Sequence, residues 1–474
     1  MKAKIHYYDI GDYLSREEKL KTIERFGSIE NIPWTIIDPN EHGDWLNKRS
    51  ELFKLYTPLE PVKKFDQKSK SVFAMYAIGL ASNRDSWVYS FSCNKIFQNM
   101  KKMIEFYNSQ QKAYHEALAI NKELKVEDFI STDSKNISWT RALRRDVANG
   151  EKYEFSSSHV RIGYYRPYCK NNLYYDHAFI ESPGLSKKLY PTPQHQNLII
   201  CVSGIGASKD FSVLITNSIP NLDTLEKSQC FPLYWYEDMS PNIYKDSTQL
   251  DFFLDPEHSY TRHDGMTDWI LTTAHKQYGN KVTKEDIFYY VYGILHSPDY
   301  RAAFSADLKK SLPRLPLVDS ADDFWAFSHA GRKLAELHLN YETIEPYRGC
   351  MPLFNASTLK GESVNYRVEK MRFGKIDSKT ANKTIIHYNN AITIEKIPLE
   401  AYEYVVNGKS AIEWIMDRYQ IKTDPASGIT NDPNDWAKEH NDEKYIYNLL
   451  LRIINVSIKT MKIVKTLPKL EFRD

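Results

Sequence analysis

EKYEFSSSHVRIGYYRPYCKNNLYYD, residues 151–176, places aromatic and β-branched residues between glycine, proline and asparagine residues. Strands that are bounded by tight turns have this composition. The segment QNLIICVSGIGASKDFSVLITNSIP, residues 196–220, repeats the pattern, and its SGIGAS portion is predicted to be the turn between two strands. Residues 150–260 are therefore predicted to be rich in β-strands.

Helical patterns flank this β-rich part. Before it, residues 94–125 carry apolar side chains at helical spacing, which predicts a long helical spacer. Nearer the start, a short strand is predicted over residues 1–12, and Ser15 with Glu18 forms a capping-box pattern for a helix that ends at Gly27. Helices are also predicted in the segments 284–297, 322–342, 400–419 and 443–464. A hairpin is predicted around Asn389 and Asn390.

The predicted fold class is α+β. We expect a first segment with a connector (1–70), a helical spacer (71–130), a β-rich domain (131–320), and a helical C-terminal region with a β-hairpin (321–474). A chain of 474 residues is long enough for two to four domains of the usual size, roughly 100–200 residues each.

Composition excludes several classes of protein. Five widely spaced cysteines without a CxxC pair argue against a disulfide framework and a structural zinc, and favour a reducing compartment. The sequence shows no apolar run long enough for a membrane span and no signal-peptide core at its start, which predicts a cytoplasmic protein. The net charge is only +2, so a nucleic-acid site must be a local patch.

One stretch, YVYGILHSPDYRAAFSADLKKSLPRLP (290–316), contains the letters of a PD…DxK nuclease: Asp299, Asp307 and Lys309. Such a nuclease needs its carboxylates on adjacent strands, where they converge on Mg²⁺. The flanking apolar residues have helical spacing instead. Ser297 and Pro298 form the cap and first residue of a helix, so a capped joint between two helices is the favoured interpretation.

Two further patterns are weak. Gly408, Lys409 and Ser410 are similar to part of a phosphate-binding loop, but the required glycine is replaced by Glu403, and a joint between helices is predicted. His258 and His263, with Glu257 or Asp264, have metal-ligand chemistry without an element that fixes their spacing, so a polar loop is favoured. We predict no metal site, no catalytic residue and no cofactor for this chain.

Positive charge and tyrosine gather in one window. Between Lys135 and Lys188 the sequence has ten lysine or arginine residues and five acidic residues, a net +5. Guanidinium groups bind phosphates and guanine edges, and tyrosine hydroxyls also contact phosphates. The window therefore indicates a nucleic-acid surface, with a solvated basic face over a tyrosine-rich core as the alternative.

Several segments together resemble one family. They are IGLASNRDSWVYSFSCNKIFQNMKKMIEFYN (78–108), ISWTRALRRDVANG (137–150), RIGYYRPYCKNNLYYD (161–176), SQCFPLYWY (228–236), YYVYGILHSPDYRAAFSADLKKSLPRLP (289–316), GRKLAELHLNYE (331–342) and NGKSAIEWIMDRYQIKTDPASGITNDPNDW (407–436). In this order they are similar to the C-terminal target-recognition region of type ISP and type IIG-like restriction-modification enzymes.

The resemblance implies the specificity portion of a larger enzyme. Residues 1–70 would close a methyltransferase-like domain, and residues 131–320 would read duplex DNA. S-adenosylmethionine, ATP and Mg²⁺ are expected only for the full-length family enzyme, whose methyltransferase and helicase-nuclease domains would be this chain's partners. Neither a cofactor loop nor an NPPY motif occurs in this sequence.

The resulting hypothesis is sequence-specific recognition of double-stranded DNA. The candidate DNA-contacting residues are Arg84, Arg141, Arg144, Arg145, Arg161, Arg166 and Lys170. As an alternative to DNA contact, Arg84 would pair with Asp85 or a buried partner. The alternative for Arg166 is a core-facing position on a strand. Two alternatives remain for the chain: a Mg²⁺-dependent nuclease that uses Asp299, Asp307 and Lys309, and a protein–protein module of the parent enzyme.

Overall fold

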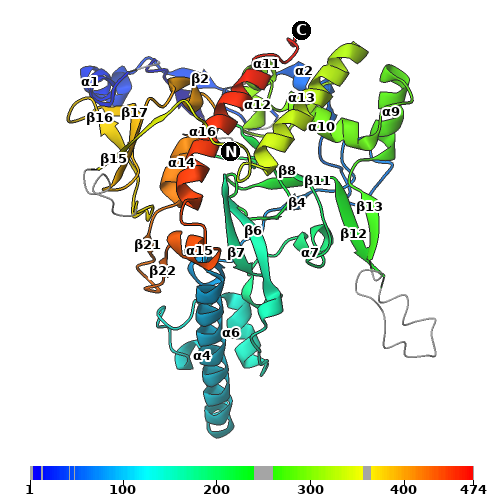
Figure 1. Ribbon diagram of the computed structural model, residues 1–474. Coiled ribbons are helices and arrows are strands. Elements are labelled where there is room, and N and C mark those ends of the chain that lie inside the picture. Colours follow the sequence, from blue (N-terminus) through cyan, green and yellow to red (C-terminus); the bar gives the residue numbers. More distant parts are fainter. Residues whose placement is uncertain are drawn as a thin grey trace.

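The computed structural model describes residues 4–11, 14–41, 43–46, 49–239, 260–355 and 364–472. Helices and strands are mixed along the chain, so the predicted α+β class is confirmed (Figure 1). Within the described part of the chain, no helix combines the length and the apolar character that a membrane crossing requires.

Two four-stranded sheets form the β-rich part. The first has the order β10-β6-β7-β5, and the second has the order β4-β11-β8-β9. Their strands are β4 (Ala77–Ile78), β5 (Tyr89–Ser90), β6 (Val160–Arg166), β7 (Cys169–Tyr174), β8 (Ile199–Val202), β9 (Val213–Thr216), β10 (Ile219–Pro220) and β11 (Gln229–Pro232). The SGIGAS segment joins β8 to β9, as predicted. Strands β4 and β5 thus bring residues 77–90 into the same sheets as the later strands.

A long helix, α4 (Cys93–Ile120), follows β5 directly and confirms the predicted helical stripe. Its buried face carries Ile96, Met100, Met103, Ile104 and Tyr107, at the spacing of one helical side. Ser92 caps the helix through the amide of Lys95. In Figure 1, α4 extends away from the sheets with the shorter α6 (Arg141–Ala148) beside it.

Five further helices contribute side chains to the hydrophobic cores of the sheets. They are α9 (Asp268–Tyr278), α10 (Lys284–Ile294), α13 (Ala321–Leu339), α14 (Ala411–Arg418) and α16 (Tyr445–Val464). Helices α10 and α13 pack so closely that a Cβ atom on Gly331 would lie 1.9 Å from the carbonyl oxygen of Tyr289, and one on Gly293 would lie 2.3 Å from that of Phe327. Two glycines thus let the two backbones touch.

The remaining elements are short. The helices are α1 (Arg16–Phe26), α2 (Glu51–Leu55), α3 (Asp85–Val88), α5 (Val126–Phe129), α7 (Ser186–Leu189), α11 (Pro298–Ala303), α12 (Ser305–Leu308) and α15 (Asn434–Glu439). The strands are β1 (Ile5–Tyr7), β2 (Thr35–Ile37), β3 (Thr57–Pro58), β12 (Tyr234–Asp238), β13 (Tyr260–Asp264), β14 (Arg314–Leu315), β15 (Met351–Phe354), β16 (Arg372–Lys375), β17 (Ala381–His387), β18 (Ile392–Glu395), β19 (Val405–Val406), β20 (Lys409–Ser410), β21 (Lys422–Thr423) and β22 (Thr430–Asn431).

Local sequence signals locate some of these elements correctly. Ser15 and Glu18 form the predicted capping box of α1, which ends at Gly27. The hairpin β17–β18 turns at Asn389 and Asn390. The segment 400–419 differs from the prediction, because a hairpin separates a short 3-10 helix (Leu399–Tyr402) from α14. Residues 405–410 form the small β19–β20 hairpin, in which Asn407 and Gly408 both have positive φ.

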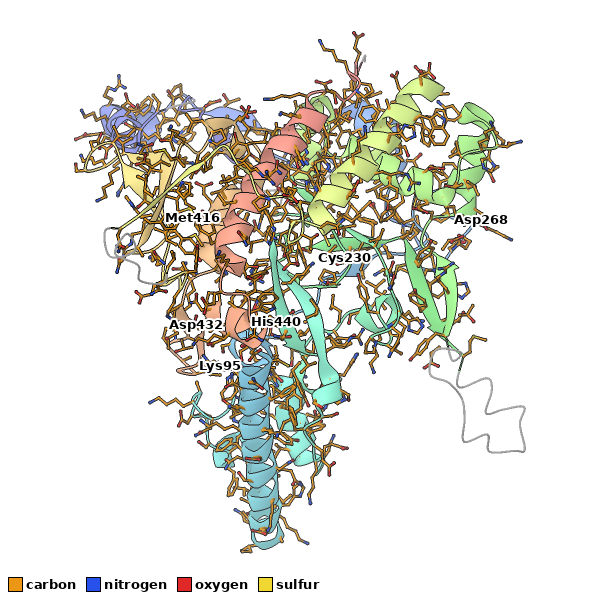
Figure 2. The ribbon with its side chains drawn as sticks, in the orientation of Figure 1. Lys95, Cys230, Asp268, Met416, Asp432 and His440 are labelled. Carbon is orange, nitrogen blue, oxygen red and sulfur yellow. The ribbon has the colours of Figure 1, made fainter. Side chains whose placement is uncertain are left out.

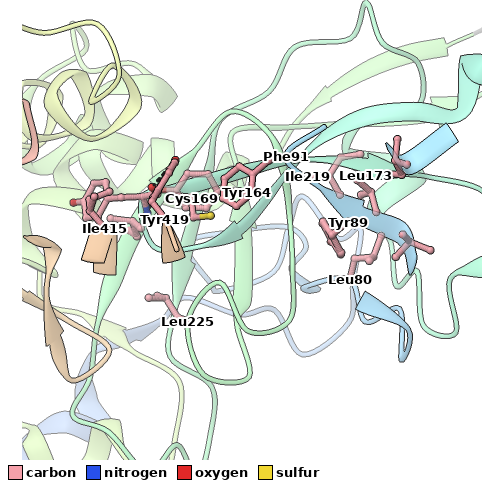
Figure 3. Packing of buried hydrophobic residues seen from close by; sticks show 14 of the residues in the cluster. Leu80, Tyr89, Phe91, Tyr164, Cys169, Leu173, Ile219, Leu225, Ile415 and Tyr419 are labelled. Atoms are coloured by element: carbon pink, nitrogen blue, oxygen red, sulfur yellow. Dashed lines mark hydrogen bonds between the residues drawn. The ribbon is translucent and has the colours of Figure 1, made fainter. Parts of the chain in front are cut away.

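Two hydrophobic cores hold the chain together, and each mixes distant segments. One joins residues of α4, β6 and β7 to residues of α14 and α16, and the other joins β8, β9 and β11 to α10 and α13. Figure 3 shows Ile415 and Tyr419 of the C-terminal part close to Cys169 and Tyr164. The division into domains at 130 and 320 stays a prediction, and both cores contain residues from either side of 320.

The close approach of α10 and α13 leads to the first testable prediction. Gly331→Ala would place a methyl group against the Tyr289 carbonyl, so we expect a loss of about 1–3 kcal/mol in the free energy of unfolding. Urea denaturation measures the change. Lys333→Ala, at an exposed position of the same helix, serves as the control. An unchanged unfolding midpoint for Gly331→Ala would contradict the packing described above.

A second prediction concerns the start of α4, where the Glu439 carboxylate accepts hydrogen bonds from Ser92 Oγ at 2.6 Å, Cys93 N at 2.9 Å and Asn94 N at 3.2 Å. Burial alone would raise the pKa of Glu439, but these three donors outweigh it and lower the pKa. The stabilisation is therefore complete above the ordinary value of 4.5 and is lost as the pH falls through the lower folded-state pKa.

Glu439→Gln should thus lower the stability by about 1 kcal/mol at neutral pH, and the difference should shrink below pH 4.5. Denaturation at a series of pH values measures it. The exposed Glu443 provides the matched control, because Glu443→Gln changes the same charge in the same segment. A difference that grows with acidity would have the wrong sign for this contact.

Candidate nucleic-acid interface

An open groove of 990 Å³ runs beside α6, between that helix, the end of α4 and the segment 177–183. Thr140 begins α6, and its side chain accepts a hydrogen bond from the amide of Leu143. Arginines occupy three of the first five positions of the helix, and all three line the groove: Arg141, Arg144 and Arg145. The same face therefore presents three guanidinium groups in a row.

Helix α6 is fixed on its other side by α4. His115 of α4 lies 2.8 Å from the carbonyl oxygen of Val147 through its Nε2 atom. Tyr107 and Asn108 of α4 bond the backbone carbonyl groups of Glu151 and Tyr153, just after α6. The arginines thus project from a helix that is braced by a longer helix.

The electrostatics of the groove are positive. Its lining includes four cationic side chains and two carboxylates: Arg141, Arg144, Arg145, Lys125, Glu127 and Glu181. Arg145 also pairs with Asp146, which accepts a bond from the Tyr153 hydroxyl. Burial is the main cause that lowers the pKa of His177, and the charge of Lys187 lowers it further. His177 therefore lines the groove as a neutral ring at pH 7.

Arg84 lies behind the groove rather than in it. Its side chain is 3% exposed, and its Nη2 atom donates to Thr140 Oγ1 at 2.7 Å. Burial lowers the pKa of Arg84 to about 10, and the nearby Glu181 opposes that change, so the guanidinium stays charged at pH 7. Because Thr140 caps α6, Arg84 supports the helix that carries the other arginines.

A second recess, of 330 Å³, lies over β6. Arg161 borders it and donates from Nη2 to the carbonyl oxygen of Thr192 at 2.7 Å. The ring of Tyr175 connects this recess to the groove: its centroid lies 5.8 Å from the Arg161 guanidinium carbon and 5.7 Å from the His177 ring. The two hollows are therefore neighbours on one part of the surface.

Arg166 and Lys170 are engaged elsewhere. Arg166 donates to Asn221 Oδ1 at 2.9 Å and lies within ion-pair distance of Asp85 and Asp223. Lys170 pairs with Glu342 at 2.7 Å. Of the seven candidate residues, the structure thus brings Arg141, Arg144 and Arg145 together, and it gives the other four internal partners. Their contacts with DNA stay predictions.

Sequence reasoning missed several residues of this surface. Lys125 and His177 line the groove, and Gln196 and Asn217 line the recess. None of them belongs to a motif, and each is brought to the site by the fold. The tyrosine-rich and basic window was the only signal in the sequence, and it ends before Gln196.

The residues of the alternative nuclease site have separate partners. Asp299 accepts a bond from the amide of Leu470 at 3.0 Å, Asp307 accepts one from the amide of Ser50 at 3.1 Å, and Lys309 pairs with Asp210. Ser297 caps α11 and Pro298 is its first residue, as predicted. These contacts give the stretch a structural role at the capped helix α11 and the following α12.

The candidate histidine site lies only partly within the described residues. His263 stacks on Trp235, with ring centroids 4.1 Å apart, and contacts Glu237. His258 and Glu257 lie outside the described residues. Within the described ranges, no three histidine, cysteine, aspartate or glutamate side chains group as metal ligands.

Comparisons with known proteins support the resemblance to the specificity region of type ISP enzymes. The family model of the type ISP C-terminal specificity domain matches residues 71–449. A comparison with curated proteins gives no match. Among solved structures, a nuclease-deletion mutant of the type ISP restriction-modification enzyme LlaGI, in complex with a DNA substrate mimic, is 36% identical with a TM-score of 0.81. It aligns over 99% of this chain and 40% of its own.

Two further structures agree. The ATP-dependent type ISP restriction-modification enzyme LlaBIII bound to DNA is 34% identical (TM-score 0.81) over 100% of this chain and 28% of its own. The DrdV–DNA complex is 25% identical (TM-score 0.79) over 99% of this chain and 44% of its own. This chain thus spans less than half the length of each of these relatives. Since the family model covers most of its residues, the chain belongs to the family of type ISP C-terminal specificity domains.

Proposed function

We propose that this chain binds double-stranded DNA and recognises a specific sequence in it, as the specificity portion of a type ISP restriction-modification enzyme. One observation carries the proposal: three guanidinium groups of one braced helix line an open groove, in a chain whose solved relatives are DNA complexes. Arginine is suited to this task because its planar fork matches phosphate oxygens and base edges.

The groove would position the duplex. Arg141, Arg144 and Arg145 would bind phosphates of the backbone, with Lys125 adding charge at the edge. Each phosphate that they neutralise releases a condensed counterion, which makes the affinity fall steeply as salt rises. Phosphate contacts carry no sequence information, so the bases would be read by other side chains nearby.

Catalysis would come from other parts of a longer polypeptide. The solved relatives extend well beyond the part that aligns with this chain. In the proposed parent enzyme, an adenine methyltransferase and a helicase-nuclease would bring S-adenosylmethionine, ATP and Mg²⁺. We assign neither the methyl transfer nor the DNA cleavage to residues of this chain.

A contact with such a neighbouring domain is the second candidate function. No described residue between positions 4 and 46 is buried. Large apolar side chains in this part are exposed instead, including Leu20 at 56%, Ile29 at 74% and Trp45 at 58%. Apolar side chains that are exposed along one segment would be covered by a protein partner packed against that segment. The segment is the one that was predicted to close a methyltransferase-like domain.

The third prediction tests the groove. Arg141→Ala, Arg144→Ala and Arg145→Ala should each weaken binding to random duplexes. Each should also lower the slope of log affinity against log salt by about 0.9 for every phosphate that the variant no longer neutralises. Fluorescence anisotropy over a salt series measures both quantities for the full chain. The expected loss of affinity is similar for all sequences, because phosphates are the same everywhere.

Arg348→Ala is the matched control, because the Arg348 side chain is 88% exposed and lies outside the groove. It removes the same charge and should leave the slope unchanged. If the control and the groove variants change the affinity and the salt slope equally, the changes result from net charge and not from the groove. Absence of any DNA binding at low salt would refute the proposed function and favour the protein-contact role.

A further inference from the structure

The recess over β6 has an unusual lining for a protein surface near a basic groove. Its lining residues, all in the described part of the chain, include one cation and no carboxylate. The remaining side chains are apolar or form hydrogen bonds: Val160, Ile162, Asn172, Tyr190, Pro193, His195, Gln196, Asn217, Ser218 and Ile219. The recess therefore presents amide groups beside apolar surface.

The apolar part is Ile162, which is 50% exposed although it stands in the middle of β6. Its cross-strand partner is Asn172, whose Nδ2 atom donates to the carbonyl oxygen of Phe91 at 3.1 Å. An exposed β-branched side chain in the middle of a strand has few rotamers, so it loses little conformational entropy when it makes a contact.

The polar part consists of two exposed amides on fixed backbone. The carbonyl oxygen of Gln196 accepts a hydrogen bond from the Tyr236 hydroxyl at 2.7 Å. Asn217 stands in the turn between β9 and β10, where the amide of Ser218 donates to Thr216 Oγ1 at 3.0 Å. Asn217 Oδ1 also accepts a hydrogen bond from the Ser218 hydroxyl at 3.3 Å, and an amide oxygen can accept a second one. Both residues are exposed and stand at the rim on ordered backbone.

Arg161 is partly buried, and one of its N–H groups is bonded to the carbonyl oxygen of Thr192, so fewer of its donors are left to read a base. This matters for the choice of base. A free arginine in the major groove favours guanine, whereas the paired donor and acceptor of a glutamine or asparagine amide match the N6 and N7 atoms of adenine. An exposed apolar side chain matches the 5-methyl group of thymine.

We propose that this recess reads an A·T base pair in the major groove: Gln196 or Asn217 bonds the adenine edge, and Ile162 contacts the thymine methyl group. The inference rests on the proposed function and adds to it a base-reading site separate from the phosphate-binding arginines. Tyr175 connects the two, so that one duplex spans the groove and the recess.

The test begins with selection of the preferred duplex from a randomised pool by the full chain. Each A·T pair of the selected sequence is then replaced by A·U, which lacks the methyl group, or by 7-deazaadenine·T, which lacks the N7 acceptor. At one position we expect each replacement to weaken wild-type binding by about tenfold. Ile162→Ala should abolish the difference in affinity between duplexes with thymine and with uracil. Gln196→Ala or Asn217→Ala should abolish the difference in affinity between duplexes with adenine and with 7-deazaadenine.

The salt dependence of binding should stay at the wild-type slope in all three variants, because none of them removes a phosphate contact. Ile205→Ala is the matched control for Ile162, since Ile205 is 54% exposed and lies outside the recess. Thermal unfolding of each variant excludes a general loss of structure as the cause.

The outcomes separate the two proposals. If no duplex binds at low salt, both the proposed function and the inference that rests on it are refuted. If the chain selects a sequence that has no A·T pair, the inference alone is overturned. The inference is likewise overturned, and the proposed function kept, if all three variants retain the wild-type discrimination at every A·T pair.

Discussion

The anchoring of α4 by one carboxylate determines where the candidate interface lies. Glu439 accepts three hydrogen bonds at the start of α4, where the helix dipole also favours a negative charge. Lys95, in the first turn of α4, pairs with Asp435 of the same C-terminal segment. Figure 2 shows Lys95 close to Asp432 and His440 of that segment. Helix α4 in turn supports α6 and its arginines. The C-terminal segment therefore positions a groove that is formed by residues more than 250 positions earlier.

Tyrosine makes this long-range assembly compatible with dense packing. Several of the largest fully buried side chains are tyrosines, and their hydroxyls reach backbone carbonyl oxygens: Tyr290 bonds Pro316, Tyr300 bonds Arg314, and Tyr388 bonds Tyr366. Each ring buries a large apolar area, and each hydroxyl satisfies an oxygen of an irregular segment. The high tyrosine content of the sequence thus serves the interior to a large extent.

The sequence predicts elements better than it predicts the site, for a physical reason. Caps and turns depend on neighbours three or four residues away, and Ser15, Ser297 and Asn389 signal them correctly. The environment of a charge depends on partners that the fold supplies. Arg84 meets Thr140 across 56 positions, and Lys170 meets Glu342 across 172, so neither could be distinguished in the sequence from a solvated cation. The arginines of α6 were identifiable because one short helix presents all three.

The small net charge of the chain constrains how DNA would be held. With a net charge of +2, attraction at a distance is weak, and at physiological salt it is screened within about 8 Å. Binding would then depend on a few cations that touch the backbone directly, and the groove beside α6 has four cationic side chains in its lining. Discrimination needs side chains that reach the base edges at a fixed distance from those cations, since phosphate contacts carry no sequence information. Tyr175, which contacts both Arg161 and His177, provides such a rigid connection between the groove with its three arginines and the recess with its amide side chains.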